Sequence, residues 1–211
     1  MRKKITLLCF FCIFVYAKIP QEKLFARCDL PKNFNANQKQ IILDSYFYAQ
    51  KKGFGYMLAA IAWQESCAGE YLINFSDPSA GIFHAHIPLV LKQYTNLKNT
   101  AFNRNLMGRF LIQNQDFAMQ VALEQLIFWN QKYSGDKQKI LKSYNKGTSW
   151  ISNEKSNALA QKYYQEVFEK IKLLQDFIPN EVKKTQNQQP TIKESQPLKK
   201  PKSDFYLLPE P

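Results

Sequence analysis

The segment at residues 56–67 is apolar on nearly every side of a helix, and it constrains the fold more than any other part of the chain. Its apolar members follow one another without a polar face: Met57, Leu58, Ala59, Ala60, Ile61, Ala62 and Trp63. A helix that is apolar all round is normally buried inside a protein. We therefore expect this segment to lie in the core of the domain.

Helical periodicity dominates residues 36–178. A first helix would carry Ile41, Ile42, Ser45 and Tyr48 on one face, and a last helix at residues 158–174 has an apolar stripe at Ala160, Tyr164, Val167, Phe168, Ile171 and Leu174. Shorter patterns predict helices around residues 90–94, 117–128 and 140–144. Residues 69–86 lack helical signals and include a typical turn sequence at residues 77–81. No alternating run is long enough for an extensive sheet, so we predict a mainly α chain with one domain at residues 36–178.

The N-terminus has the layout of a secretory signal peptide. Three basic residues follow Met1, and residues 5–17 are then apolar up to the small residue Ala17. A permanent membrane helix needs about 20 apolar residues, so this stretch is short for one, and an uncleaved N-terminal anchor is the alternative. We expect residues 1–17 to be a signal peptide and the protein to be exported, to the periplasm or the cell envelope.

Composition separates two flanking segments from the helical domain. Residues 18–35 are a short polar lead-in that contains Cys28. Residues 179–211 are rich in proline, lysine and glutamine and hold too few apolar side chains to offset the entropy of ordering, so we expect a disordered tail. The net charge of the chain is +12, which favours polyanionic partners. Charge alone does not distinguish nucleic acid from wall polymer or anionic membrane, but export favours the latter two.

Two cysteines would remain after removal of residues 1–17. Cys28 and Cys67 could form a disulfide in an oxidising compartment or be two buried thiols, and the sequence leaves both open. The spacing of the four cysteines fits no zinc site. His84 and His86 are the two histidines of the chain and have no obvious acidic or thiol partner nearby, so we expect no metal site.

Glu65 is an acid at the end of the apolar segment. Carboxylates are rarely buried without a partner, and burial raises the pKa of a carboxyl group in general. A carboxyl group that keeps its proton near neutral pH can donate it to a leaving oxygen, as the acid in the apolar pocket of lysozyme does. Glu65 is therefore a candidate general acid, whereas its position alone also allows an exposed glutamate at a helix end.

Three short motifs follow one another along the chain. They are Glu-Ser at residues 65–66, Gly-Ile-Phe-His at residues 81–84 and Ser-Tyr-Asn-Lys-Gly at residues 143–147, the last preceded by Gly-Asp at residues 135–136. In order and approximate spacing they resemble the Glu-Ser, Gly-Leu-Met-Gln and Ala-Tyr-Asn-Ala-Gly motifs of the soluble lytic transglycosylases, relatives of goose-type lysozyme. Each motif is weak alone, but three in order over residues 54–175 are specific.

The resemblance implies a single lysozyme-like helical domain and a role for each matching residue. Glu65 stands in the place of the catalytic acid. The substrate-binding residues that it implies are Ser76, Phe83, His84, Tyr144 and Asn145. His84 stands where the family has glutamine, and a neutral imidazole still offers one donor and one acceptor. The loop that holds Ser76 is slightly longer than is usual in the family.

The resemblance also implies a reaction. The glutamate would protonate the glycosidic oxygen between N-acetylmuramic acid and N-acetylglucosamine, and would then take the proton of the muramic 6-hydroxyl as this hydroxyl attacks its own ring. The product is a 1,6-anhydro sugar, formed without water, metal or organic cofactor. Peptidoglycan strands would be the substrate. An envelope-spanning secretion or appendage machine would suit the basic tail as a partner, and nucleic acid is not expected.

Three alternatives differ in chemistry. A lysozyme-type hydrolase would keep the fold and use water, for which most glycosidases need a second carboxylate; Glu70 and Asp77 are the acids of the loop. A non-catalytic exported wall-binding module would account for the histidine at position 84, although Glu65, Tyr144 and Asn145 argue against it. A nucleic-acid-binding protein rests on charge alone, because no basic-aromatic motif supports it.

Overall fold

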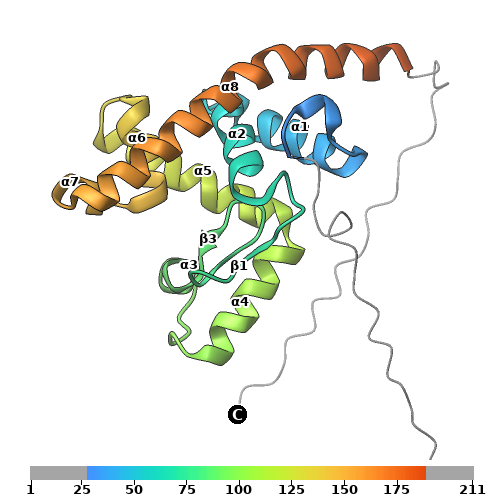
Figure 1. The fold of residues 1–211 in the computed structure, drawn as a ribbon. Coiled ribbons are helices and arrows are strands. Elements are labelled where there is room, and N and C mark those ends of the chain that lie inside the picture. Colours follow the sequence, from blue (N-terminus) through green and yellow to red (C-terminus); the bar gives the residue numbers. More distant parts are fainter. Residues whose placement is uncertain (1–27, 189–211) are drawn as a thin grey trace, which may run out of the picture.

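The computed structural model describes residues 28–188, and these are mainly α, as the periodicity predicted (Figure 1). The helical elements are η2 (Pro31–Asn33), α1 (Ala36–Gln50), α2 (Gly55–Ser66), α3 (Ile87–Tyr94), α4 (Ala101–Gln113), α5 (Gln115–Lys132), α6 (Lys137–Lys146), α7 (Ser149–Ser152) and α8 (Glu154–Gln188). The predicted signal peptide, residues 18–27 of the lead-in and the tail beyond residue 188 lie outside the described residues. No helix within residues 28–188 combines the length and the apolar character needed to cross a membrane.

The apolar segment forms α2, and its expected burial is confirmed. Every side chain from Met57 to Trp63 is buried, and Leu58 and Ile61 are fully buried. α1, α5 and α8 pack around it. Full burial of one such leucine or isoleucine contributes about 1.5–3 kcal/mol, so this helix is a main source of the stability of the fold.

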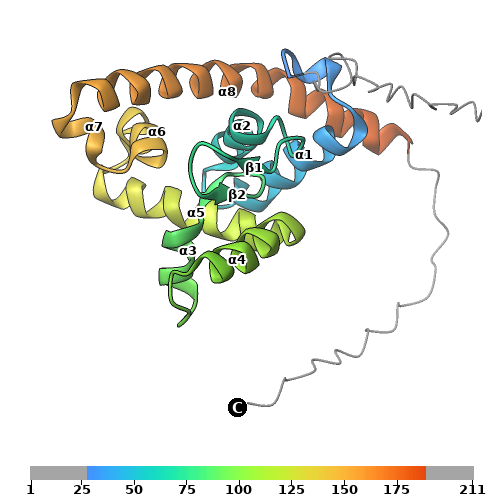
Figure 2. The same cartoon turned by 60° about the horizontal axis from the view of Figure 1, so that its bottom comes forward.

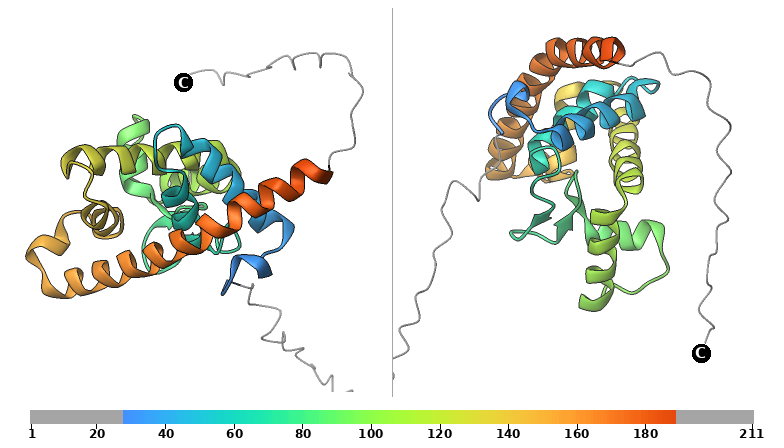
Figure 3. Two further views of the ribbon diagram at one scale, coloured as in Figure 1. Left: turned by 90° about the horizontal axis from the view of Figure 1, so that it is seen from above. Right: turned by 90° about the vertical axis from the view of Figure 1, so that its right-hand side faces the viewer.

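Two parts of the molecule meet at the C-terminal end of α2. α8 runs along one side, past α7, α6, α2 and α1, while α5 lies on the other side of α6 and α2 (Figure 2). The strands, α3 and α4 form a separate lower part that α5 connects to the rest (Figures 1 and 3). The chain leaves α2 and passes directly into the strands, so residues at the end of α2 lie at the junction of the two parts.

The lower part contains a small sheet that the sequence did not predict. β1 (Ile73–Asn74), β2 (Ser79–Ala80) and β3 (Ala85–His86) are antiparallel in the order β1-β2-β3. The turn from β2 to β3 contains Gly81 at φ +82, and a Cβ there would lie 2.9 Å from the carbonyl oxygen of Leu111 in α4. The glycine of the second motif therefore has a structural reason, because it allows α4 to approach the turn closely.

α8 is longer than the predicted last helix, and the predicted end of the domain at residue 178 is wrong. The helix continues through Pro179 to Gln188, so residues 179–188 are helical rather than part of a disordered tail. Leu174 and Ile178 are buried in the core, and Glu181 forms an ion pair with Lys39 of α1 at 3.5 Å. Proline removes one backbone donor from a helix, and these contacts with α1 and the core offset that loss.

The sequence also gave no signal for α4. This helix buries Met107, Gly108 and Leu111, but it exposes Phe102 and Phe110. Because apolar residues lie on its outer face as well as its inner face, they do not form the single stripe that predicts an amphipathic helix.

Candidate active site

Glu65 lies in the last turn of α2, and its side chain is 16% exposed. The helix ends one residue later, at Ser66, because Cys67 and Ala68 adopt left-handed backbone conformations, with φ of 55° and 54°. Such conformations cost about 1–3 kcal/mol each for residues other than glycine, so they persist only where the surroundings hold them. The turn that follows Glu65 therefore requires support from elsewhere in the fold.

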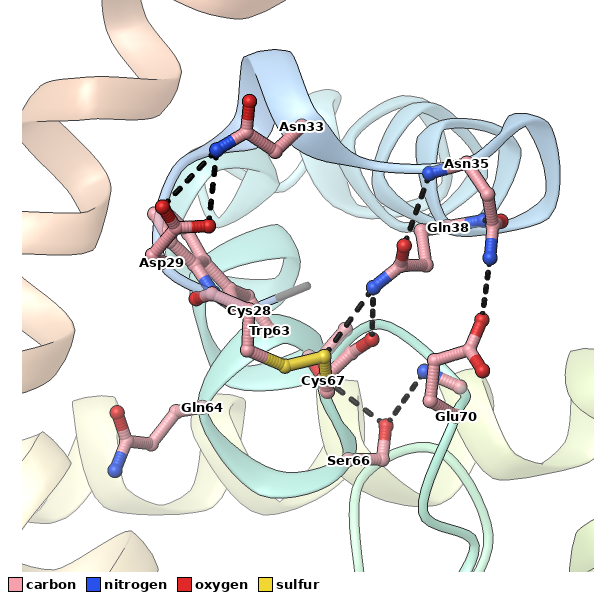
Figure 4. Close-up of a disulfide and its surroundings, with 12 residues drawn as sticks. Cys28, Asp29, Asn33, Asn35, Gln38, Trp63, Gln64, Ser66, Cys67 and Glu70 are labelled. Carbon is pink, nitrogen blue, oxygen red and sulfur yellow. Dashed lines mark hydrogen bonds between the residues drawn. A yellow bond between two sulfur atoms is a disulfide. The ribbon is translucent and has the colours of Figure 1, made fainter. Parts of the chain in front are cut away.

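The support comes from a disulfide and a set of hydrogen bonds around it (Figure 4). Cys67 is cross-linked to Cys28, with their Cα atoms 5.6 Å apart, which settles the pairing that the sequence left open. The side chain of Gln38 donates to the carbonyl oxygen of Cys67 at 3.0 Å, and Trp63 Nε1 donates to that of Cys28 at 2.8 Å. Ser66 Oγ accepts a hydrogen bond from the backbone N–H of Gly69 at 2.9 Å. Together these contacts fix the backbone on which Glu65 sits.

His84 approaches Glu65 from the turn between β2 and β3. Its own φ of +43° is left-handed, and its Nδ1 lies 3.4 Å from Oε2 of Glu65, while Nε2 lies 2.8 Å from the carbonyl oxygen of Tyr71. Burial lowers the pKa of His84, but the contacts with Glu65 and Tyr71 and the charges of Glu65 and Asp77 outweigh it, so the pKa is raised above its ordinary value. The acid of the first motif and the histidine of the second are thus in contact, which the sequence analysis did not predict.

Tyr144 reaches the same place from α6. Asp136 begins this helix by accepting a hydrogen bond from the backbone N–H of Lys139 at 3.1 Å, which gives a reason for the Gly-Asp pair ahead of the third motif. The hydroxyl of Tyr144 donates to the carbonyl oxygen of Phe83 at 3.3 Å. Burial, and then the negative charge of Glu65, raise its pKa well above the ordinary value. Tyr144 is therefore a neutral hydroxyl beside the carboxylate.

Tyr163 is a site residue that the sequence reasoning missed. It lies on α8, is 6% exposed, and its hydroxyl makes no hydrogen bond of normal geometry within residues 28–188, although it interacts with the carboxyl group of Glu65. Burial, followed by the charge of Glu65, the proximity of Tyr144 and a weak hydrogen bond with Glu65, raises the pKa of Tyr163 well above the ordinary value. The expected stripe on this helix ran through Tyr164, whereas the buried face runs through Tyr163. Both tyrosines lie three or four residues from Ala160 and from Val167, so the helical spacing does not distinguish between them.

The structure places the remaining predicted substrate residues in three different environments. The expectation for Phe83 is wrong for its side chain, which is 1% exposed and packs in the core, so only its carbonyl oxygen faces the site. Ser76 lies in the exposed turn between β1 and β2 and donates its hydroxyl to Asn74 at 2.6 Å, so the structure does not join it to Glu65. Asn145 follows Tyr144 on α6, is half-buried, and makes no side-chain hydrogen bond within residues 28–188.

The two other acids of the loop occupy different settings. Glu70 is exposed and accepts a hydrogen bond from Asn35 at 2.6 Å. Asp77 is also exposed and accepts from the hydroxyl of Ser79, but its charge reaches His84. Within the described part of the chain, no cluster of three or more histidine, cysteine or acidic side chains could hold a metal ion.

A cavity of about 570 Å³ is lined from Ala85, the residue after His84, but neither Glu65 nor His84 itself lines it. β3, α3 and α5 line it with a mixture of aromatic, amide and carboxylate groups, including His86, Gln93, Tyr94, Glu124, Phe128 and Trp129. An aromatic row continues from this cavity. The ring of Trp129 stacks on that of Tyr133 with centroids 5.9 Å apart, and the ring centroids of Tyr133 and Trp150 are 6.4 Å apart. Nε1 of Trp150 donates to the hydroxyl of Ser143 on α6. Apolar walls with a few polar groups are typical of ligand sites.

Comparison with known proteins gives one sequence relative. No family model and no solved structure matches the chain. A protein of Enterobacteria phage T4, described as an uncharacterized 20.7 kDa protein in the vs-regB intergenic region, is 32% identical over 127 residues. The match covers 60% of this chain and 65% of the phage protein, so it spans less than two thirds of that relative. The chain is similar to this phage protein in sequence, and the description of the relative states no activity.

Proposed function

We propose that the protein is a peptidoglycan lytic transglycosylase. The observation that carries the proposal is a carboxyl group at the end of a buried helix, in contact with His84 and beside the hydroxyls of Tyr144 and Tyr163. Glu65 would protonate the oxygen of the β-1,4 bond between N-acetylmuramic acid and N-acetylglucosamine. It would then accept the proton of the muramic 6-hydroxyl as that oxygen bonds to C1 and closes the 1,6-anhydro ring.

The surroundings of Glu65 suit this use of one acid. Its low exposure limits the water that could compete with the 6-hydroxyl for the cationic sugar. The two tyrosine hydroxyls are neutral and lie close to Glu65, and that of Tyr163 can donate a hydrogen bond to the carboxylate that forms when Glu65 gives up its proton. No metal or organic cofactor has a part in these steps.

The setting of the site supports a polymer substrate and an exported protein. The cavity that starts at Ala85, next to His84, has the aromatic side chains of Tyr94 and Phe128 in its wall, and these can receive a sugar ring. A structural disulfide is typical of proteins outside the reducing cytosol, in agreement with export to the periplasm or cell envelope. As part of the same proposal, the enzyme would open the wall locally for an envelope-spanning secretion or appendage machine.

Digestion of purified peptidoglycan tests the proposal. The purified chain should release 1,6-anhydro-muropeptides, read by mass spectrometry, and Glu65→Gln should release none. Glu70→Gln is the matched control, because Glu70 is exposed, lies close by in sequence and is held by Asn35. It should keep wild-type activity. If both variants lose activity to the same extent, the loss is not specific to Glu65.

The same digestion separates a hydrolase from a transglycosylase. A hydrolase is the second candidate, and the position of Asp77 favours it. The charge of Asp77 acts on His84, which contacts Glu65, and its carboxylate could assist a water molecule. Reducing-end muropeptides that disappear in Asp77→Asn would establish hydrolysis. Absence of any product from the wild type, with retained binding to insoluble peptidoglycan, would favour a non-catalytic wall-binding module.

A further inference from the structure

The contacts of His84 determine which of its two ring nitrogens carries the proton in the neutral form. A carbonyl oxygen can only accept, so the 2.8 Å contact between Nε2 of His84 and the carbonyl oxygen of Tyr71 places a proton on Nε2. In the neutral imidazole, Nδ1 then carries a lone pair and lies 3.4 Å from Oε2 of Glu65. Two lone pairs face each other there unless a proton lies between them. The left-handed backbone of His84 and the cross-linked turn after Glu65 hold the two groups in place.

We propose that Glu65 and His84 share one proton and act as a dyad, in which His84 stores the proton that Glu65 delivers to the glycosidic oxygen. The proton resides either on the carboxyl oxygen, facing the lone pair of Nδ1, or on Nδ1, facing the carboxylate. His84 is a positioning residue in this scheme, since it acts on the sugar through Glu65. This inference rests on the proposed function for its catalytic meaning, whereas proton sharing is a property of the free protein.

The proton balance of the dyad closes over one reaction cycle. The C1–O bond to N-acetylglucosamine breaks, and the leaving oxygen takes the shared proton through Glu65, which leaves a carboxylate and a neutral imidazole. The muramic 6-oxygen then bonds to C1, and its proton passes to Glu65, which restores the dyad. No oxidant, reductant or water is consumed.

The groups around the dyad favour retention of the proton. Glu65 comes from α2 and Asp77 from the turn between β1 and β2, and both are acids whose charges stabilise an imidazolium. Tyr144 of α6 and Tyr163 of α8 lie beside Glu65 and remain neutral, because their pKa values are raised. Two groups that interact this closely titrate as a pair, so the shared proton belongs to the dyad and not to either residue alone.

Nuclear magnetic resonance of the histidine rings tests proton sharing without any substrate. The full chain holds two histidines, so His84→Gln and His86→Gln assign both signals and His86 is an internal control. We expect the ring of His84 to be protonated on Nε2 in the neutral form. Glu65→Gln should lower its pKa by about one unit, a tenfold loss of proton affinity, because a neutral amide replaces the carboxylate. A ring protonated on Nδ1, or a titration of His84 that Glu65→Gln does not move, would overturn the dyad.

The pH profile of peptidoglycan digestion tests its use in the reaction. His84→Gln keeps a donor for the carbonyl oxygen of Tyr71 and an amide beside Glu65, but it cannot store a proton. Each protein is compared with its own maximal rate at acid pH, because His84 is itself part of the site. Relative to that maximum, the activity of the variant should decline at a lower pH than that of the wild type. If the two declining limbs lie one pH unit apart, the variant should be about tenfold less active than the wild type at the alkaline end. Parallel profiles would show that His84 is only structural. Failure of both proteins to release product, with the ring titration as expected, would reject the proposed function and leave the shared proton standing.

Discussion

The C-terminal ends of α2 and α6 present one site residue each, but they are held by different means. Glu65 precedes a turn of left-handed residues that a disulfide and Gln38 hold from other parts of the chain. Tyr144 precedes Gly147, whose φ of 57° and ψ of −127° suit glycine alone, and no other atom lies within 4 Å of where its Cβ would be. The acid thus depends on a tertiary cross-link, while the tyrosine depends on local backbone chemistry.

The difference predicts how each half of the site fails. Loss of the cross-link should loosen both the turn after Glu65 and the segment around Cys28. The hydrogen bond from Trp63 to the carbonyl oxygen of Cys28 should then weaken as well. Loss of the glycine should distort only the end of α6, whose beginning is capped independently by Asp136. Removal of the cross-link should therefore affect folding more than replacement of the glycine.

The double variant Cys28→Ala/Cys67→Ala should have the largest effect. The bridged residues are 39 positions apart, and the chain-entropy relation gives about 4 kcal/mol for a loop of this length. We expect the free energy of unfolding in urea to fall by about that amount. Adding a reductant to the wild type should reproduce the loss, and the same reductant should not affect the variant. If reduction leaves the wild type unchanged, the end of α2 is held by Gln38 and Ser66 instead.

Gly147→Ala should have the next largest effect. Alanine has no steric conflict there, so the expected loss of about 2 kcal/mol comes from the backbone conformation alone. Urea unfolding measures it, and reductant should not change the difference from the wild type. Gly53→Ala is a matched control, because Gly53 also has a positive φ of 80° and open space around it, but lies in the turn after α1 and not on α6. It should destabilise the fold without lowering peptidoglycan digestion.

These two ends also show what the sequence could reveal. The apolar run of α2 predicted that this helix is buried. Glu65 at its end was identifiable as a candidate site residue because acids are rare in such apolar runs. The left-handed turn after it was not identifiable, since Cys67 and Ala68 are not residues that favour this conformation. A contact between residues 28 and 67 depends on the packed fold, so composition could only offer the pairing as one of two outcomes.

The errors at α8 have a similar cause. Pro179 reads as the end of a helix, but contacts of Ile178 and Glu181 with the rest of the fold carry the helix past it. Tyr163 and Tyr164 are adjacent tyrosines, and periodicity alone did not decide which one faces inward. The position of α2 beneath α8 decides it, and that position is a property of the tertiary structure.

Asp136→Ala sharpens the comparison at the other end of α6. The carboxylate caps the helix, and its loss should cost about 1 kcal/mol of unfolding free energy. The hydrogen bond from Lys139 lowers the pKa of Asp136, so the folded state prefers the ionised form. The stabilisation is therefore present above the ordinary pKa of aspartate and is lost as the pH falls through the lowered value. Unfolding at a series of pH values should show the difference from the wild type narrowing in acid, and a constant difference would contradict the capping role.

Tyr163→Phe should change folding least, and it tests whether the two helix ends serve one site. The hydroxyl is buried and makes no hydrogen bond of normal geometry within residues 28–188, so its removal should change the free energy of unfolding by no more than about 1 kcal/mol. It nevertheless interacts with the carboxyl group of Glu65, so its use would be to donate to the carboxylate that forms when Glu65 gives up its proton. Release of anhydro-muropeptides should then drop about tenfold, the value of one hydrogen bond, while the stability stays nearly unchanged. Tyr164→Phe is the matched control on the same helix, where the ring stacks on Phe168, and should keep full activity. Full activity of Tyr163→Phe would instead show that α8 contributes packing to the site and no chemistry.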